Sequence, residues 1–195
     1  MELIPEKEFI DSMLESLNDI ESGWIYGDDE EKYRKIGSVD IVNHKLKIAI
    51  EIKDVKNINL PPAGNGAYNT NLKSVSKNFQ RDIESANKKF RNYPKYQSVI
   101  LIRHLSRATK HTLAYLIGGF YTLTEYGRIP NTEVNISRHS EECSVYAFLN
   151  PNWSDELVFY RNSKSCRESD IVVELLQKNF INFDEILEDD LWSKN

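Results

Sequence analysis

The sequence predicts an α/β protein in which helices flank a mixed central sheet, and three segments support this fold class. Residues 48–53 alternate isoleucine with alanine, glutamate and lysine, which is the period of a strand with one face in the core. Residues 72–91 carry apolar side chains at helical spacing, and residues 98–102 form a short apolar run typical of a buried strand. Strand, helix and strand in this order imply a right-handed crossover and a partly parallel sheet.

The other expected elements lie on both sides of this unit. Before it we expect a helix that begins near Pro5 and continues to Leu17, a strand over 24–26 and a solvated acidic loop over 28–31. We then expect a hairpin of strands 38–40 and 48–53 with its turn at 43–45, followed by a polar loop over 57–71. After it we expect a helix over 106–117, strands over 120–125, 132–138, 144–149 and 156–161, a helix over 168–180 and an acidic tail over 184–190. Residues 1–119 are assigned to a core, and residues 120–195 to a strand-rich extension with a C-terminal helix, packed on the same domain.

The composition fits one soluble globular domain, because 40% of the 195 residues are hydrophobic and 28% are charged. No apolar run approaches the roughly 20 residues of a membrane helix, so we expect no signal peptide and no membrane partner. The two cysteines, Cys143 and Cys166, lack the spacing of a metal site. They favour a protein of the reducing cytoplasm and not a fold that is held together by disulfides. The sequence contains neither a phosphate-binding loop motif nor a dinucleotide-binding glycine motif.

Charge is distributed unevenly along the chain. Residues 72–111 hold ten lysines and arginines and two acidic residues, a balance of +8, so the rest of the chain carries −13 of the total of −5. This asymmetry favours a polyanion that docks on one side of the molecule.

The functional hypothesis rests on Asp40, Glu51 and Lys53. A hairpin loop with an even number of residues places Asp40 on the same face as Glu51 and Lys53, with opposed or diagonal side chains roughly 5–8 Å apart. Two carboxylates beside buried isoleucines are costly unless a cation or a base neutralises them. A solvated strand face with a weak cross-strand ion pair is the alternative. We favour a site for a hard cation and an activated water.

This arrangement resembles that of the PD-(D/E)XK nuclease superfamily, which includes restriction endonucleases and archaeal Holliday junction resolvases. The matching residues are Asp40 and, after a gap of ten residues, the run Glu51-Ile52-Lys53. Val39 stands where the superfamily name has proline. The resemblance covers roughly residues 5–103 and implies a restriction-endonuclease-like core.

The resemblance also implies roles for individual residues. Asp40, Glu51 and the carbonyl of Ile52 would hold Mg²⁺, for which Mn²⁺ could substitute, and Lys53 would position or deprotonate the attacking water. Glu6 resembles the first-helix glutamate of the resolvase branch and would orient a second metal or its waters. The substrate-binding residues expected on the basic helix flank are Lys73, Lys77, Gln80 and Arg81.

We therefore predict a metal-dependent nuclease whose partner is nucleic acid, with DNA favoured over RNA, and whose copies could pair as a homodimer to cut both strands. One alternative is a catalytically silent module of the same fold that binds nucleic acid or a protein. Another is a structural α/β domain whose acidic strand face is solvated.

Overall fold

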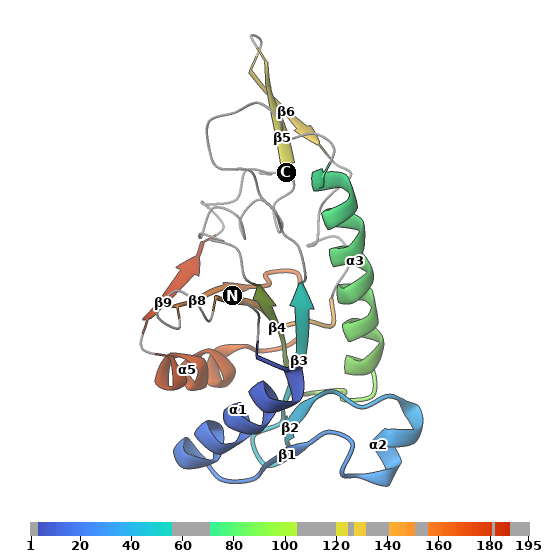
Figure 1. Ribbon diagram of the computed structural model, residues 1–195, viewed down its shortest axis with the longest axis vertical. Helices are drawn as coiled ribbons and strands as arrows, with labels where there is room; N and C mark the ends of the chain where they lie inside the picture. The colour runs from blue at the N-terminus through green and yellow to red at the C-terminus, as the bar shows by residue number, and fades with distance from the viewer. Residues whose placement is uncertain are drawn as a thin grey trace.

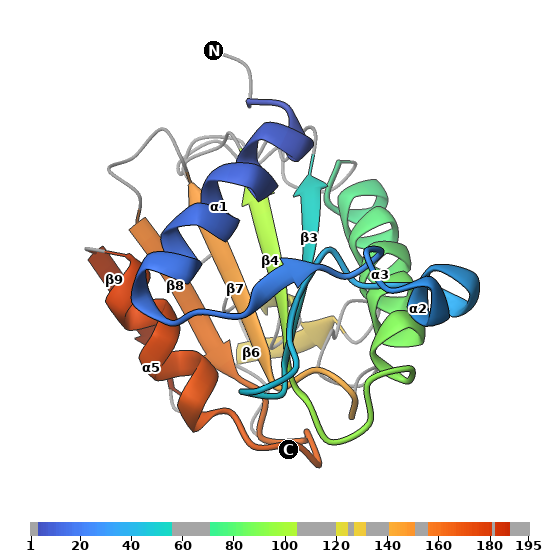
Figure 2. The same cartoon turned by 90° about the horizontal axis from the view of Figure 1, so that it is seen from below.

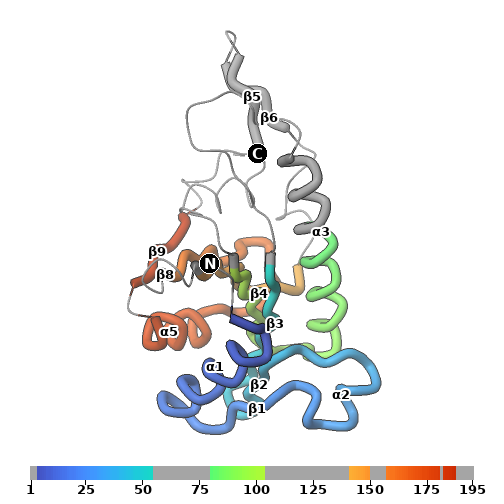
Figure 3. Tube along the Cα trace, in the orientation of Figure 1, coloured from blue at the N-terminus to red at the C-terminus, as the bar shows by residue number. Residues whose placement is uncertain are grey.

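The computed structural model describes the backbone of residues 4–55, 71–104, 120–124, 127–131, 141–150, 156–180 and 182–187 (Figure 1). Side chains are described for these residues except 55, 71–79, 104, 120–124, 127–131, 150 and 156 (Figure 3). The protein is an α/β fold in which helices cover both faces of a seven-stranded mixed sheet (Figures 1 and 2). The predicted α/β class with a helix-flanked mixed sheet is confirmed.

The described elements follow one another from α1 at the N-terminal end to β9. They are α1 (Glu6–Ile20), β1 (Trp24–Tyr26), α2 (Glu31–Ile36), β2 (Ile41–Asn43), β3 (Ile48–Val55), α3 (Asn71–Phe90), β4 (Gln97–His104), β5 (Phe120–Thr124), β6 (Gly127–Asn131), β7 (Val145–Asn150), β8 (Glu156–Arg161), α5 (Asp170–Asn179) and β9 (Asn182–Ile186).

The large sheet has the strand order β1-β2-β3-β4-β7-β8-β9, whereas β5 and β6 pair with each other. Strands β3, β4 and β7 are parallel neighbours, and so are β8 and β9, while the remaining neighbours are antiparallel. The predicted unit of strand, helix and parallel strand is therefore present as β3, α3 and β4. Strands β7, β8 and β9 extend this same sheet.

Two hydrophobic cores lie on the two faces of the sheet. On one face the isoleucines of β3 pack with apolar residues of α1 and α5, among them Leu17 and Val172. On the other face Ala49 of β3 packs with Ile83, Ala86 and Phe90 of α3. The alternation along β3 thus directs Glu51 and Lys53, which share the face of Ala49, toward α3.

The hairpin of β2 and β3 differs in detail from the prediction. Its first strand begins at Ile41, so that Asp40 immediately precedes it, and the turn spans residues 44–47. Lys47, which lies outside the predicted turn over 43–45, adopts the left-handed conformation (φ 55°). Asn43 instead ends β2, and its side-chain oxygen accepts a hydrogen bond from the Leu46 N–H at 2.9 Å. The turn is therefore closed by a side chain.

Three further elements were not predicted. Residues 31–36 form α2 after the acidic loop, residues 127–131 form β6, and the acidic tail contributes β9, whose Ile186 joins the core on the α3 face. Residues 57–70 of the predicted loop over 57–71, the predicted helix over 106–117 and the predicted strand over 132–138 fall outside the described residues. In the described part of the chain, no helix combines the length and the apolar character needed to cross a membrane.

Candidate active site

Asp40 and Glu51 meet because the hairpin has the register that the sequence required. The turn of four residues pairs Ile41 with Ile50, so that Asp40 falls opposite Glu51. Three hydrogen bonds fix Asp40: its N–H donates to the Ile50 carbonyl at 3.2 Å, its carbonyl accepts from the Gly27 N–H at 3.1 Å, and its Oδ2 accepts from the Ile52 N–H at 2.6 Å. The second carboxylate oxygen, Oδ1, is left for other partners.

Glu51 is a fully buried carboxylate, with an exposed fraction of 0%. Its Oε1 accepts hydrogen bonds from Lys53 Nζ at 2.5 Å and from Lys89 Nζ at 2.6 Å. Its Oε2 is buried without a hydrogen-bond partner among the described residues. Burial and the nearby charge of Asp40 raise the pKa of Glu51, and the two lysines offset only part of this rise. Oε1 is therefore hydrogen-bonded, whereas Oε2 could accept a ligand.

Lys53 lies beside Glu51 on the same face of β3. Burial acts to lower the pKa of its ammonium group, but the charge of Glu51 and the hydrogen bond to it prevail and raise the pKa above its ordinary value. Lys53 is consequently a cation at neutral pH in this arrangement. It is suited to orient a water or to stabilise negative charge.

Lys89 completes the group, and the sequence did not single it out. Its Nζ lies 2.6 Å from Glu51 Oε1 and 3.9 Å from Asp40 Oδ1. The available signal was its position on α3, three residues after the buried Ala86 and next to the buried Phe90, which turns it toward the sheet. The sequence alone places Lys89 only in the basic segment over 72–111.

Glu6 begins α1 and lies near the same site. Burial and the charges of Asp40 and Asp54 raise the pKa of Glu6, whereas Lys53 and Arg103 oppose this rise. These influences place Glu6 within electrostatic reach of Asp40. Its role at the site stays a prediction, supported by this shared electrostatic environment.

A buried ion pair holds the start of α1 against the sheet. Arg103 of β4 has an exposed fraction of 0% and donates from Nε and Nη2 to the two carboxylate oxygens of Asp54, each at 2.6 Å. Its Nη1 donates to the Ile4 carbonyl at 3.3 Å, and its guanidinium stacks on the Phe9 ring at 4.4 Å from the centroid. Glu6 lies between these two contacts in the chain and is positioned by them.

The residues predicted to bind substrate are described only in part. Arg81 is 75% exposed on α3 and forms a loose ion pair with Asp82 at 3.8 Å, and Gln80 is half-buried on the same helix. The side chains of Lys73 and Lys77 lie outside the described residues. Arg103 and Lys89 belong to the basic segment but are engaged by acidic residues, so the exposed positive charge is smaller than the sequence suggested.

The two carboxylates fit a hard cation that keeps most of its water. No cluster of three or more histidine, cysteine, aspartate or glutamate residues suited to a metal occurs within the described ranges. Mg²⁺, however, retains several waters and is commonly bound by only one or two carboxylates. Glu51 Oε2, which is buried and unpartnered among the described residues, and Asp40 Oδ1 are the oxygens that could serve. Ile52, whose carbonyl was the third predicted ligand, lies between Glu51 and Lys53 and donates its N–H to Asp40.

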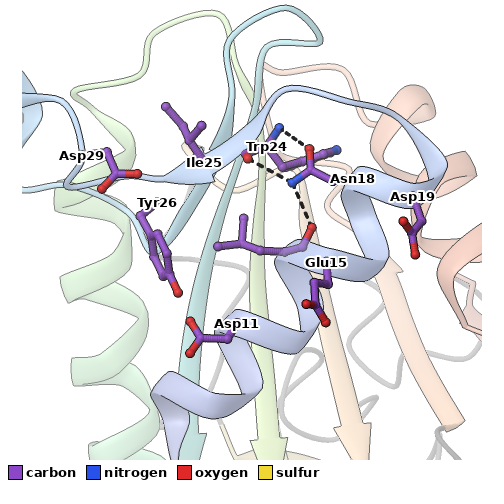
Figure 4. Close-up of a pocket in the computed structure, with 9 residues that line it drawn as sticks. Asp11, Glu15, Asn18, Asp19, Trp24, Ile25, Tyr26 and Asp29 are labelled. Atoms are coloured by element: carbon purple, nitrogen blue, oxygen red, sulfur yellow. Dashed lines mark hydrogen bonds between the residues drawn. The ribbon is translucent and has the colours of Figure 1, made fainter.

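A separate pocket lies on the other side of the sheet, between α1 and β1 (Figure 4). It is lined by acidic and aromatic side chains, which are Asp11, Glu15, Asp19, Asp29, Trp24 and Tyr26. Asn18 joins its two walls, because it accepts hydrogen bonds from the N–H groups of Gly23 and Trp24 and donates to the Leu14 and Trp24 carbonyls. The acidic lining repels a polyanion, and none of the predicted site residues lines this pocket.

Comparison with protein-family models, curated proteins and solved structures returns no match for this chain.

Proposed function

We propose that the protein is a metal-dependent nuclease with a restriction-endonuclease-like core, which hydrolyses phosphodiester bonds in DNA. The observation that carries this proposal is the carboxylate of Glu51, buried beside Asp40 and Lys53 with one oxygen unpartnered among the described residues. A buried carboxylate with an open oxygen is costly in a purely structural role, whereas a bound cation would satisfy it. The strand order β2-β3-β4 and the helix α3 also support the resemblance drawn from the sequence.

Each residue of the site would have a separate role that follows from its position. Asp40 Oδ1 and Glu51 Oε2 would hold Mg²⁺, which when bound would lower the pKa of a coordinated water and offset charge on the phosphate. Lys53, a cation held in place by Glu51, would orient the water or donate to the negatively charged transition state. Glu6 would accept hydrogen bonds from waters at the edge of the site.

Exposed basic residues of α3 would bind the nucleic-acid backbone. Arg81, Lys88 and Arg91 are all exposed on or at the end of this helix, which also supplies Lys89 to the site. Phosphate contacts of this kind dominate affinity and weaken as salt increases. We therefore expect the substrate to approach the α3 side of the sheet, away from the acidic pocket.

The test is cleavage by the purified protein. We expect Mg²⁺ or Mn²⁺ to support cleavage in a panel of linear, supercoiled, single-stranded and branched DNA, and chelation by EDTA to abolish it. Asp40→Asn keeps an oxygen that can accept the Ile52 N–H, and Lys53→Met keeps the apolar stem. Each should lower the rate by at least about 100-fold without unfolding the protein.

Asp29→Asn is the matched control for these variants, because Asp29 is exposed and lies in a loop outside the site. It should cleave like the wild type. Absence of cleavage of every DNA and RNA substrate with either metal would contradict the proposal. Equal cleavage by the wild type and Asp40→Asn would also contradict it, since the activity would then come from elsewhere.

A second candidate is a catalytically silent module that binds nucleic acid. The observation that favours it is the pairing of Glu51 with both Lys53 and Lys89, which gives the two acids counter-ions without a metal. Such a module would shift DNA in a gel with the same affinity in EDTA and in Mg²⁺, and it would never cleave the DNA.

A further inference from the structure

Lys89 bridges the two acidic residues of the site, Asp40 and Glu51, which we call the acidic pair. Its Nζ donates to Glu51 Oε1 at 2.6 Å and lies 3.9 Å from Asp40 Oδ1. Together with Lys53, it balances the two negative charges of the acidic pair with two positive charges. The ammonium group thus supplies, beside the two carboxylates, the positive charge that a divalent cation bound to Asp40 Oδ1 and Glu51 Oε2 would supply.

The two lysines are anchored differently. Lys53 projects from β3 two residues after Glu51, so its backbone is fixed beside its partner. Lys89 reaches the acidic pair from α3, in another layer of the fold, and its side chain is 28% exposed. The lysine stem is long and flexible and its ammonium is readily hydrated, so Lys89 can withdraw toward solvent without a change in the backbone.

We propose that Lys89 is an internal counter-ion of the acidic pair, which a divalent cation displaces when it binds. The inference rests on the metal site of the proposed function and deepens it by naming the residue that sets the affinity for the cation. Lys89 makes the metal-free site nearly neutral and thereby keeps the buried carboxylates compatible with folding. The same positive charge opposes the approach of a cation until Lys89 leaves.

The test is Mn²⁺ binding measured by calorimetry in the absence of nucleic acid. Lys89→Met should bind Mn²⁺ at least about tenfold more tightly than the wild type, because a positive charge beside the ligand oxygens has been removed. Lys89→Arg keeps the charge and should bind no more tightly than the wild type. Lys35→Met removes the charge of an exposed lysine on α2, away from the acidic pair, and should match the wild type.

Thermal unfolding separates this role from a purely structural one. Lys89→Met should melt at a lower temperature than the wild type in EDTA, and saturating Mn²⁺ should recover that loss. If Lys89→Met folds only in the presence of Mn²⁺, the proposal is supported in its strongest form. A loss of stability that Mn²⁺ does not recover would overturn it, because Lys89 would then be only a tie between α3 and β3.

The outcomes also separate this inference from the proposed function. Metal-dependent cleavage with equal Mn²⁺ affinity in the wild type and Lys89→Met overturns the role of Lys89 alone. Tighter Mn²⁺ binding by Lys89→Met in a protein that cleaves nothing supports Lys89 and contradicts the nuclease. Absence of Mn²⁺ binding by both proteins overturns both.

Discussion

Two carboxylates of β3 are shielded from water, but they are stabilised in different ways. Asp54 uses both oxygens to bind the guanidinium of Arg103, whereas Glu51 uses only Oε1 and leaves Oε2 unpartnered among the described residues. Among the described residues, both oxygens of Asp54 are therefore hydrogen-bonded, whereas only one oxygen of Glu51 is. Asp54 and Arg103 are therefore structural, and Glu51 is the acid that can accept a further ligand.

The ion pair of Arg103 gives a prediction at the scale of single residues. Arg103→Met keeps much of the side-chain volume but leaves Asp54 without its partner and frees the start of α1. The free energy of unfolding should fall by about 3–5 kcal/mol, because an uncompensated and largely buried charge remains. Urea unfolding measures this change. Arg81→Met, at an exposed arginine, should change stability by less than about 0.5 kcal/mol, and a similarly small effect at Arg103 would contradict the assignment.

Residue-level prediction from sequence succeeded where one hairpin decides the outcome. Strand alternation and an even-numbered turn suffice to bring Asp40, Glu51 and Lys53 to one face. The contact of Lys89 with Glu51, and those of Arg103 with Ile4 and Phe9, could not be predicted in this way, because they depend on how α3 and α1 are placed against the sheet. The ion pair of Arg103 with Asp54 depends instead on the register between β3 and β4. The sequence alone places Lys89 in the basic segment over 72–111 and gives no partner for it.

At the scale of elements, the position of Asp40 depends on a close backbone contact. Gly27, which follows β1, lies against the segment that precedes β2. A Cβ atom at Gly27 would lie 2.0 Å from the Val39 carbonyl oxygen, so only glycine permits this contact. The Gly27 N–H donates to the carbonyl of Asp40, the next residue. The backbone of Gly27, directly after β1, thus holds the segment that carries Asp40.

Gly27→Ala should accordingly disturb both stability and the site. The overlap with backbone atoms of Val39 has to be relieved by moving the segment that includes Asp40. We expect a loss of about 1–3 kcal/mol in the free energy of unfolding and a weaker affinity for Mn²⁺. Denaturant unfolding and calorimetry measure the two effects. An alanine variant with wild-type stability and metal affinity would show that the close contact has no such role.

Elements with a strong period were predictable, and elements that depend on tertiary pairing were not. The sequence identified α1, α3, β3, β4, β7, β8 and α5 because each has a helical or strand pattern of apolar residues. It missed β9, an edge strand of mostly polar residues that is defined by its pairing with β8. It also missed α2, a helix of six residues that follows an acidic loop and buries Tyr33.

At the scale of the whole molecule, a tyrosine buried in the core between α2 and the segment after α3 makes stability depend on pH. Tyr93 follows α3, is fully buried and stacks on Tyr33 at 4.4 Å between ring centroids. Burial raises the pKa of Tyr93 to about 12, an effect that the Val39 backbone reduces only in part. The folded protein therefore retains the phenolic proton at pH values where the unfolded chain loses it.

The sign of the resulting pH dependence follows from linkage. Because the pKa of Tyr93 is higher in the folded state than its ordinary value of 10.0, its contribution is present below pH 10 and is lost as pH rises toward about 12. The free energy of unfolding should fall over this interval, as measured by urea unfolding at successive pH values. Tyr93→Phe has no phenolic proton, so its stability should fall less steeply with pH than that of the wild type. Identical slopes would contradict the assignment.

We propose that Asp40 and Glu51 together bind one divalent cation, and a crystal structure of the wild-type protein soaked in Mn²⁺ is the decisive test. We expect an anomalous peak coordinated by Asp40 Oδ1 and Glu51 Oε2, with Lys89 Nζ no longer within hydrogen-bond distance of Glu51. Crystals saturated with Mn²⁺ that show no peak at these oxygens, and in which Glu51 stays bonded to both lysines, would contradict the claim.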